Sequence, residues 1–249
     1  MSLIKVGISG ANGRMGKAIE SVISLKSDKF ELVAKLTSSS TKSEVEKSCR
    51  ACDVIIDFSK PGSLKHLMHF ASKFSAKIVI GTTALEREHF RYIEEAAKNV
   101  AVVYAPNTSL GANLLEDLSI RAASILNGYD AEIVEAHHKY KKDSPSGTAL
   151  AIGKSIAKAR KIDFDANAVF DRCSRGLRQK DDITFSSIRG GGIFGEHEIL
   201  FAGDNEVISI GHKALSRDAF AEGAVYAASW IASREPGLYS MRNVLGLDK

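Results

Sequence analysis

Residues 4–16 read IKVGISGANGRMG, and this stretch decides the fold of the amino-terminal half. The apolar run 4–9 has the pattern of a buried strand, and residues 17–23 have the spacing of an amphipathic helix. Glycines at positions 10, 13 and 16 permit a tight turn, close approach of the backbone to a pyrophosphate and close packing of helix on strand. The spacing departs from the strict Gly-x-Gly-x-x-Gly, but its place between a strand and a helix predicts a dinucleotide-binding loop.

The alternation of strand and helix continues along this half of the chain. Strands are expected at 30–36, 53–58, 77–80 and 100–104, and helices at 61–74 and 86–98. Such a succession pairs its strands in parallel, which predicts a Rossmann-like α/β domain whose ligands bind beyond the carboxyl ends of the strands. The residues expected to contact the nucleotide are Gly10, Ala11, Asn12, Gly13, Arg14, Met15, Phe58, Gly81, Thr82, Thr83, Ala105, Pro106, Asn107 and Thr108.

The segment after the second strand bears on the choice of nucleotide. Residues 37–42 read TSSSTK, without the carboxylate that usually accepts the ribose 2′-hydroxyl of NAD. Hydroxyl groups and the Lys42 ammonium suit a 2′-phosphate instead. We therefore expect Thr37 and Ser38 to face the adenosine ribose, with NADPH preferred and NADH tolerated.

Composition narrows the class of protein. The 249 residues are 44% apolar, enough for one large or two modest cores, and the formal net charge of +4 is too mild and dispersed to predict nucleic-acid binding. The sequence shows neither a bilayer-spanning apolar stretch nor a signal-peptide pattern, so we expect a cytoplasmic protein without membrane contact. Three cysteines are an odd number, which suits a reducing compartment, and Cys49-x-x-Cys52 has no second pair with which to complete a zinc site.

Residues 135–149, EAHHKYKKDSPSGTA, concentrate positive charge between a strand expected at 129–136 and a helix expected at 148–157. Pro145 delays the helix, Ser146 is a favoured N-cap, and Gly147 admits a ligand close to the backbone. This arrangement predicts a site for a multiply charged anion at a helix N-terminus, although an ordinary solvated basic loop is the alternative. Neighbouring side chains at a strand end face opposite ways, so His137 and His138 are not expected to share a metal ion.

The second half has a different pattern. A helix at 113–126 precedes the basic segment, and strands at 182–189, 196–202 and 206–211 follow without helices between them, before a final helix at 217–233. This predicts an α+β domain with a mixed, open sheet. One face of that sheet would lack a covering layer, which favours oligomerisation.

The chain resembles the dihydrodipicolinate reductase family, whose members are 4-hydroxy-tetrahydrodipicolinate reductases of diaminopimelate and lysine biosynthesis. The most specific match is 135–149, supported by 10–16, 81–83, 105–107, 188–190, 195–197 and 237–241. The resemblance implies a nucleotide domain of residues 1–108 and 217–249, a substrate-binding and tetramerisation domain of residues 109–216, and a homotetramer. It also implies NAD(P)H-dependent reduction of 4-hydroxy-tetrahydrodipicolinate to tetrahydrodipicolinate.

Site residues follow from the same resemblance. His137 matches the family's acid/base histidine and Lys141 its proton donor, while His138, Lys141, Ser146, Gly147 and Thr148 match residues that hold the substrate carboxylates. No metal is implied. The sequence departs from the family at Thr37 and Ser38, where members that accept NADH well often carry an acidic and then a basic residue.

Two other functions fit part of the pattern. Another dehydrogenase of the same architecture, acting on an amino acid or aldehyde, would share the glycine loop but would have no need of the basic segment. A non-catalytic NADP-sensing regulator would have no need of so many titratable groups in one loop. A turnover assay separates the regulator from an enzyme.

Overall fold

A computed structural model of the chain describes residues 2–248. The chain divides into two compact units, the first comprising the chain up to Leu110 and again from Arg217 onwards, the second running from Gly111 to Ser216. The second unit is thus inserted in sequence between the two segments of the first. Within the described residues, no helix is both long and apolar enough to span a bilayer.

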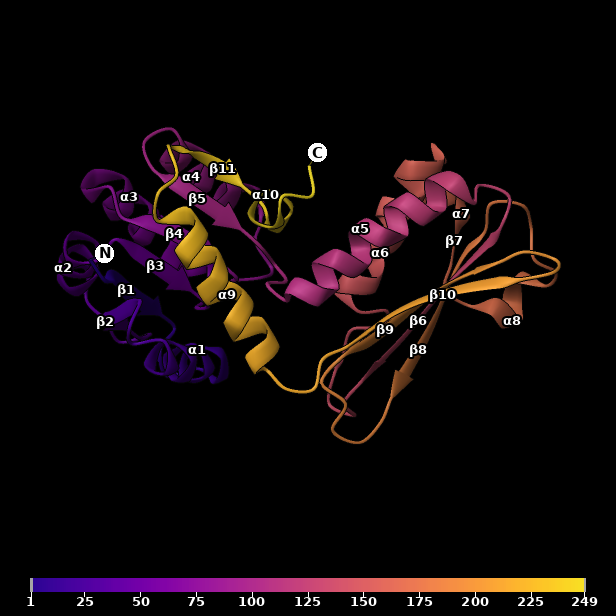
Figure 1. Cartoon of the computed structure of the whole chain (residues 1–249), viewed down its shortest axis with the longest axis horizontal. Coiled ribbons are helices and arrows are strands. Elements are labelled where there is room, and N and C mark those ends of the chain that lie inside the picture. Colours follow the sequence, from indigo (N-terminus) through magenta and orange to yellow (C-terminus); the bar gives the residue numbers. More distant parts are fainter. Residues whose placement is uncertain (1, 249) are drawn as a thin grey trace. The chain divides into compact units, whose positions relative to one another are not determined.

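The first unit is built on a six-stranded sheet in the order β11-β5-β4-β3-β1-β2 (Figure 1). Among the described residues its neighbouring strands all pair in parallel, which confirms the predicted Rossmann-like sheet. The strands are β1 (Ile4–Ser9), β2 (Phe30–Leu36), β3 (Val54–Asp57), β4 (Lys77–Ile80), β5 (Ala101–Tyr104) and β11 (Gly237–Tyr239). The short β11 was not expected, because its three residues are too few to show a period.

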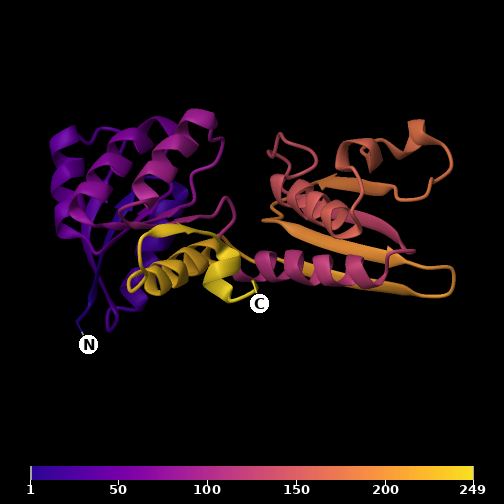
Figure 2. The ribbon, with the colours of Figure 1, turned by 90° about the horizontal axis from the view of Figure 1, so that it is seen from above.

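Helices cover both faces of this sheet. One layer is α1 (Arg14–Leu25) and α9 (Asp218–Ile231), and the other is α2 (Lys42–Ala51), α3 (Leu64–Phe74) and α4 (Arg87–Ala97) (Figures 1 and 2). Alternate strand residues separate the two cores: Ile56 packs with the first layer and Ile55 with the second. A 3₁₀ turn, Pro61–Ser63, precedes α3, and α10 (Met241–Leu245) follows β11.

The sequence pattern missed α2. Only Val45 and Cys49 are large apolar residues within this helix, too few to reveal a helical period. Its start is marked instead by a capping box: Thr41 Oγ1 accepts the N–H of Glu44, and the Glu44 carboxylate accepts the N–H of Thr41. Cys49 and Cys52 lie at the end of this helix as buried free thiols, and burial raises the pKa of each to about 12.

The second unit has a five-stranded mixed sheet in the order β10-β9-β6-β8-β7. Strand β6 is parallel to β8 and antiparallel to β9. The strands are β6 (Asp130–His137), β7 (Ala168–Val169), β8 (Ile183–Arg189), β9 (Glu196–Ala202) and β10 (Val207–Lys213). This is the mixed sheet that the sequence predicted, with β7 as an additional edge strand.

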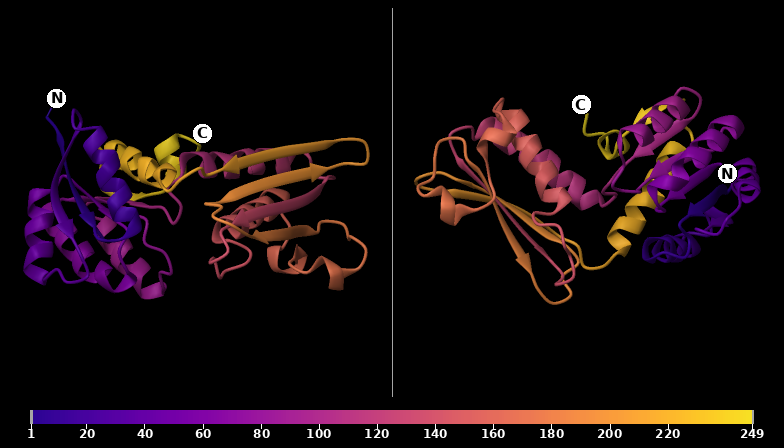
Figure 3. Two further views of the ribbon diagram at one scale, coloured as in Figure 1. Left: turned by 90° about the horizontal axis from the view of Figure 1, so that it is seen from below. Right: turned by 180° about the vertical axis from the view of Figure 1, so that it is seen from behind.

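Two long helices, α5 (Leu110–Ile125) and α6 (Gly147–Arg160), lie along one face of this sheet (Figure 3). Their core combines Leu115 and Ile152 with Ile133, Phe185 and Ile199 from the strands. The short helices α7 (Phe164–Asn167) and α8 (Arg172–Arg175) flank β7 in the chain. On the opposite face of the sheet, Ile188 is 53% exposed and Val207 is 57% exposed, so apolar side chains there face solvent within the single chain.

Candidate functional site

The glycine loop of the first unit is shaped by close backbone contacts. The N–H groups of Gly10 and Ala11 both donate to the carbonyl oxygen of Leu36, at 2.9 Å each. A Cβ at position 16 would lie 2.4 Å from the carbonyl oxygen of Gly10, so only glycine allows α1 to start this close to the loop. Gly10 itself has φ 86°, a left-handed conformation that favours glycine.

The start of α1 has the features of a phosphate site. Its N-cap is Gly13, and within residues 2–248 no side chain caps this end, in contrast to α2 and α6. The first N–H groups of a helix have no intrahelical acceptor, and the helix dipole adds positive potential there. These features fit the pyrophosphate of a dinucleotide.

A groove of about 640 Å³ opens beside this loop, beyond the ends of β1, β2 and β3. It brings together six of the residues predicted to contact the nucleotide: Gly10, Asn12, Gly13, Thr37, Ser38 and Phe58. Ser40, Lys42, Lys60 and His66 also line it, and of these four His66 was not predicted. The groove therefore has the size, the free helix start and the hydroxyl and cationic groups that a phosphorylated nucleotide requires.

The remaining predicted contacts lie elsewhere in the described chain. Ala11, Thr82, Ala105 and Thr108 are buried, and Thr108 Oγ1 donates to the carbonyl oxygen of Phe220 at 2.7 Å. Gly81 lies under the Phe58 ring, since a Cβ there would come within 2.2 Å of it. Arg14, Met15, Thr83, Pro106 and Asn107 are at least partly exposed. None of these ten residues lines the groove, so their nucleotide contacts stay predictions.

Asp57, at the end of β3, begins a turn expected to line the ligand site, but its buried hydrogen bonds were not predicted. Its side chain is fully buried and accepts hydrogen bonds from Thr82 Oγ1, at 2.6 Å, and from Ser59 Oγ. Burial raises the pKa of this carboxyl, against the opposing effect of its hydroxyl partners. Asp57 thus links the ends of β3 and β4, and an acid at the end of an apolar strand is the sequence signal that marks it.

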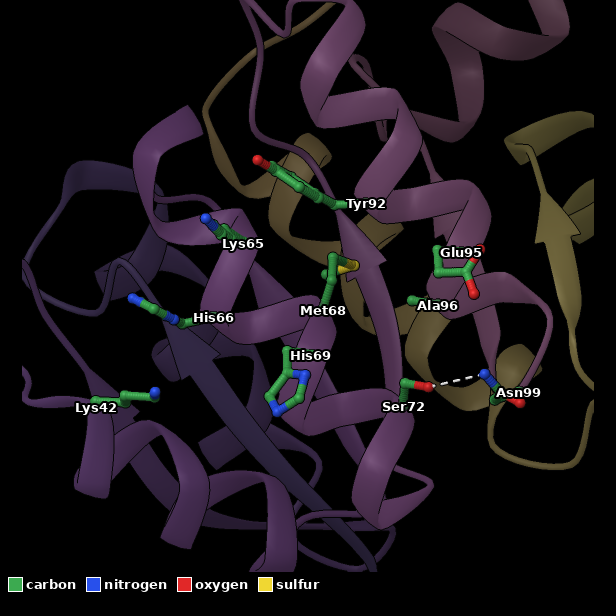
Figure 4. A pocket seen from close by; sticks show the side chains of 10 residues that line it. All are labelled: Lys42, Lys65, His66, Met68, His69, Ser72, Tyr92, Glu95, Ala96 and Asn99. Atoms are coloured by element: carbon green, nitrogen blue, oxygen red, sulfur yellow. Dashed lines mark hydrogen bonds between the residues drawn. The ribbon is translucent and has the colours of Figure 1, made fainter.

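A second pocket of about 460 Å³ adjoins the groove, because Lys42 and His66 line both (Figure 4). Figure 4 shows the cationic side chains along α2 and α3, while Glu95 and Asn99 lie at the α4 end. The second pocket is lined by Lys42, Lys65, His66, Met68, His69, Ser72, Tyr92, Glu95, Ala96 and Asn99. The Lys42 ammonium therefore lies between the groove and this second pocket.

The basic segment of the second unit is organised around Glu135 on β6. Its carboxylate is 0% exposed and accepts two hydrogen bonds from Arg189, from Nη1 at 2.8 Å and from Nη2 at 2.6 Å. His137 Nδ1 lies 2.6 Å from it, and the N–H of Ser146 donates to it at 3.2 Å. Burial raises the pKa of Glu135, but hydrogen bonds from Arg189, Ser187 and His137 outweigh burial and bring it to about 2.

His137 is buried and packs edge to face on His197, with 5.2 Å between the ring centroids. Burial has the largest effect on the pKa of His137 and lowers it. The charges of Lys141 and Arg189 lower this pKa further, whereas the Glu135 carboxylate raises it. His138 is half-buried, and its ring lies 6.3 Å from that of Tyr140. The two neighbouring histidines thus have different surroundings. Within residues 2–248, no group of three or more His, Cys, Asp or Glu side chains could hold a metal ion.

Lys141 lies in the loop between β6 and α6. Its ammonium is 2.9 Å from Asp143 Oδ2, and the side chain is 22% exposed. Lys139 and Lys142 are exposed, and the Lys139 ammonium lies over the Tyr140 ring at 5.1 Å from its centroid. Lys141 is therefore the lysine most enclosed in this loop, held by a carboxylate that was not predicted to take part.

Ser146 caps α6 as predicted. Its Oγ accepts the N–H of Ala149 at 3.2 Å and lies 3.0 Å from His197 Nε2. Gly147, the first helical residue, is exposed, and Thr148 is half-buried. The structure therefore places the predicted carboxylate-binding residues on one loop and helix start, next to the buried Glu135 and His197 and the partly exposed Arg189.

Family models match nearly the whole chain. One described as dihydrodipicolinate reductase, N-terminus, matches residues 4–108, and one described as dihydrodipicolinate reductase, C-terminus, matches residues 111–245. A protein of Rickettsia canadensis (strain McKiel), named 4-hydroxy-tetrahydrodipicolinate reductase, is 42% identical over 245 residues, covering 97% of this chain and 98% of its own. A protein of the same name from Sulfurimonas denitrificans is 40% identical over 254 residues, covering 98% and 99%.

Solved structures share the fold. Dipicolinate-bound dihydrodipicolinate reductase from Paenisporosarcina sp. TG-14 aligns with a TM-score of 0.77 at 23% identity, covering 97% of this chain and 99% of that one. The C. glutamicum DAP dehydrogenase in complex with DAP aligns with a TM-score of 0.58 at 14% identity, covering 96% and 93%. At these identities the likeness concerns the architecture alone.

Proposed function

The chain belongs to the dihydrodipicolinate reductase family, and from this premise we propose how its residues reduce 4-hydroxy-tetrahydrodipicolinate to tetrahydrodipicolinate. It is an oxidoreductase of lysine and diaminopimelate biosynthesis, as its relatives are. The observation that carries the proposal is that one chain contains both a groove beside the glycine loop and a cluster of ionisable side chains at the start of α6. Family membership removes the two alternative functions that the sequence left open.

The chemistry requires a hydride and a proton. Loss of the substrate hydroxyl as water, with a proton from the neighbouring carbon, leaves a carbon–carbon double bond conjugated to the imine. When bound, a nicotinamide nucleotide would supply the hydride, which is accepted at the carbon that carried the hydroxyl. That carbon is conjugated to the imine, so electrons move toward nitrogen and the resulting enamine must take a proton at the neighbouring carbon. Lys141, partly enclosed and positively charged, is the proton donor, and His137 is its acid/base neighbour.

The substrate carries two carboxylates, and the start of α6 suits one of them. Ser146 Oγ accepts the N–H of Ala149, and the positive end of the helix dipole at the same turn favours an anion there. We assign the carboxylates to His138, Lys141, Ser146, Gly147 and Thr148. The Lys141 ammonium would exchange the exposed carboxylate of Asp143 for a substrate carboxylate.

The groove favours NADPH over NADH. Thr37 and Ser40 close a tight turn, in which the N–H of Thr37 donates to Ser40 Oγ at 3.0 Å. Lys42 and His66 lie along the same groove and continue into the cationic pocket of Figure 4. The neighbouring acid, Glu44, has its carboxylate bonded to Thr41. A 2′-phosphate would thus meet hydroxyl and cationic groups rather than a free carboxylate.

We also propose a homotetramer formed through the sheets of the second unit. The sheet face that α5 and α6 leave open exposes Ile188 and Val207. Covering such a face removes apolar surface from water and is the usual solution for an open sheet. Sedimentation equilibrium measures the assembly, and a monomer at micromolar concentration would refute it.

The test of the activity follows nicotinamide absorbance with freshly generated 4-hydroxy-tetrahydrodipicolinate and either NADPH or NADH. Oxidation that depends on both substrates is expected, and none above background would refute the proposal. Pyridine-2,6-dicarboxylate, a planar compound with the same two carboxylates, should compete with the substrate. Absent or non-competitive inhibition would argue against the site at residues 135–149.

A further inference from the structure

We infer that Glu135, clamped by Arg189, is a positioning residue that fixes His137 with its proton on Nδ1, and that the neighbouring buried His197 turns the Ser146 hydroxyl into a donor for the substrate. The catalytic consequence rests on the proposed function. The proton positions do not, because they follow from contacts within the second unit.

The first step concerns the Glu135 carboxylate. An ionised carboxylate only accepts hydrogen bonds, and this one has no solvent contact with which to exchange them. Its partners are the two Arg189 nitrogens, the Ser187 side chain, the N–H of Ser146 and His137 Nδ1. Because Glu135 remains ionised, His137 must place a proton on Nδ1 to complete the 2.6 Å hydrogen bond.

The second step concerns the other ring nitrogen. With Nδ1 protonated, a neutral imidazole leaves Nε2 as an acceptor. Gly195 stands beside this atom, and a Cβ at that position would lie 3.1 Å from Nε2. The missing side chain keeps space open at Nε2, where a reacting group or the Lys141 ammonium can approach.

The third step sets the charge of His137. The groups around it are Glu135 on its own strand, Arg189 on β8, His197 on β9 and Lys141 in the following loop. Burial and the two cations lower the pKa of His137 against the pull of Glu135. His137 is therefore neutral near pH 7. Of His137 and Lys141, the histidine is then the proton acceptor and the lysine is the proton donor.

The fourth step concerns Ser146. Burial lowers the pKa of His197, and the nearby His137 lowers it further, to about 4. The His197 ring is therefore neutral near pH 7. Its Nδ1 is buried and has no hydrogen-bond partner among the described residues, whereas Nε2 lies 3.0 Å from Ser146 Oγ. A buried N–H without an acceptor is costly, so the proton of His197 belongs on Nε2.

Ser146 Oγ then accepts two hydrogen bonds, one from His197 Nε2 and one from the N–H of Ala149. A hydroxyl has two acceptor positions and one proton, so its remaining capacity is to donate. The buried His197 thus prepares a donor for a substrate carboxylate before substrate arrives, and no rotation of the hydroxyl is needed on binding.

Glu135→Gln tests the first half of the inference. The glutamine amide cannot be an anionic acceptor for both Arg189 and His137, so the tautomer of His137 is no longer fixed. We expect kcat to fall by about 10²-fold or more, with nucleotide affinity unchanged. Glu132→Gln is the matched control, since Glu132 lies on the same strand and also pairs with an arginine, Arg178, but on the other face of the sheet. Equal losses in the two variants would overturn the proposal.

Nitrogen-15 NMR of the parent protein tests the proton positions without turnover. We expect His137 protonated on Nδ1 and His197 on Nε2 near pH 7, with His137 shifted toward the other tautomer in Glu135→Gln. His137 protonated on Nε2 in the parent would refute the inference even if the enzyme is active. The expected tautomers in a protein that does not oxidise NAD(P)H would refute the proposed function and leave the positioning intact.

Two variants of His197 test the donor role of Ser146. His197→Phe removes the N–H and should weaken pyridine-2,6-dicarboxylate binding about tenfold, as expected when a polar partner is lost beside a charged ligand. His197→Gln retains an N–H donor and should recover most of that affinity. Equal binding by both variants would overturn the second half of the inference.

Discussion

The proposed nucleotide groove of the first unit and the proposed anion site of the second are formed by different kinds of groups. The groove is shaped by backbone contacts, glycine and hydroxyl side chains, with the N–H groups of Gly10 and Ala11 fixed on Leu36. The anion site is shaped by ionisable side chains, with Glu135 buried between Arg189 and His137. The groove is therefore vulnerable to added atoms, whereas the anion site is vulnerable to changes in charge and proton position that leave its shape unaltered.

Gly16→Val should break the groove most severely. The new Cβ would lie 2.4 Å from the carbonyl oxygen of Gly10, and backbone must move to accommodate it. A loss of about 4 kcal/mol in nucleotide binding, about 10³-fold in Kd, is expected. Titration calorimetry measures it, with Gly128→Ala as control because nothing lies within 4 Å of a Cβ at that position. Parent-like affinity in Gly16→Val would show that α1 tolerates displacement.

Lys141→Ala should impair the anion site without altering the groove. Loss of both a proton donor and a carboxylate partner should lower kcat by about 10²-fold or more and also raise KM. Lys142→Ala, an exposed neighbour, serves as the control. If Lys141→Ala turned over as fast as the parent, lysine would be removed from the mechanism and His137 would be the remaining candidate donor.

The two units should respond to acid in opposite directions. The pKa of His197 is lowered by burial to about 4 in the folded protein, so its neutral form contributes stability above its unfolded pKa of about 6.5. That contribution, up to about 3 kcal/mol, is lost as pH falls from 6.5 toward 4. Burial raises the pKa of Asp57, so this carboxyl penalises folding once it ionises, and the penalty in the first unit is relieved as pH falls.

Hydrogen exchange followed by mass spectrometry resolves the two responses, since peptides from β6, β8 and β9 report on the second unit and those from β1, β3 and β4 on the first. Faster exchange on acidification, after correction for intrinsic rates, is expected for the second unit and should be reduced in His197→Gln. Equal pH slopes in both units would contradict the assigned burial effects.

Thr37→Glu should produce the smallest change. A carboxylate at the end of β2 would accept the ribose 2′-hydroxyl and repel a 2′-phosphate. At an effective dielectric near 20, repulsion across a few ångströms is worth about a few kcal/mol before screening, enough to shift the NADPH/NADH affinity ratio about tenfold. Calorimetric dissociation constants for both nucleotides measure the ratio. An unchanged ratio would show that Thr37 does not face the adenosine ribose.

The parts of the molecule that sequence predicts well are local. A strand, three glycines and a helix lie next to one another in the chain, so the loop of residues 10–16 could be inferred from spacing alone. The N-cap at Ser146 could also be predicted from neighbouring residues, and the structure confirms it. The mixed sheet followed from consecutive strand patterns, although α2 and β11 lacked enough apolar residues to be predicted.

The cluster around Glu135 in the anion site depends on strand register, which the sequence does not reveal. Pairing of β6 with β8 places Arg189 opposite His137, and pairing of β6 with β9 places His197 opposite Glu135. A shift of one residue would send these side chains to the other face of the sheet. The segments that contain Arg189 and His197 are part of the family resemblance. Their positions beside Glu135, however, follow only from the pairing of the strands.

Transfer of an isotope tests the central claim most directly, namely that a nucleotide held at the glycine loop reduces the dicarboxylate. The parent enzyme is given freshly generated 4-hydroxy-tetrahydrodipicolinate with NADPH deuterated at its transferable position, and the product is analysed by mass spectrometry and NMR. We predict one deuterium on the product, at the carbon that carried the hydroxyl group, for each nucleotide oxidised. Nucleotide oxidation without deuterium in the product, or no oxidation at all, would contradict the claim.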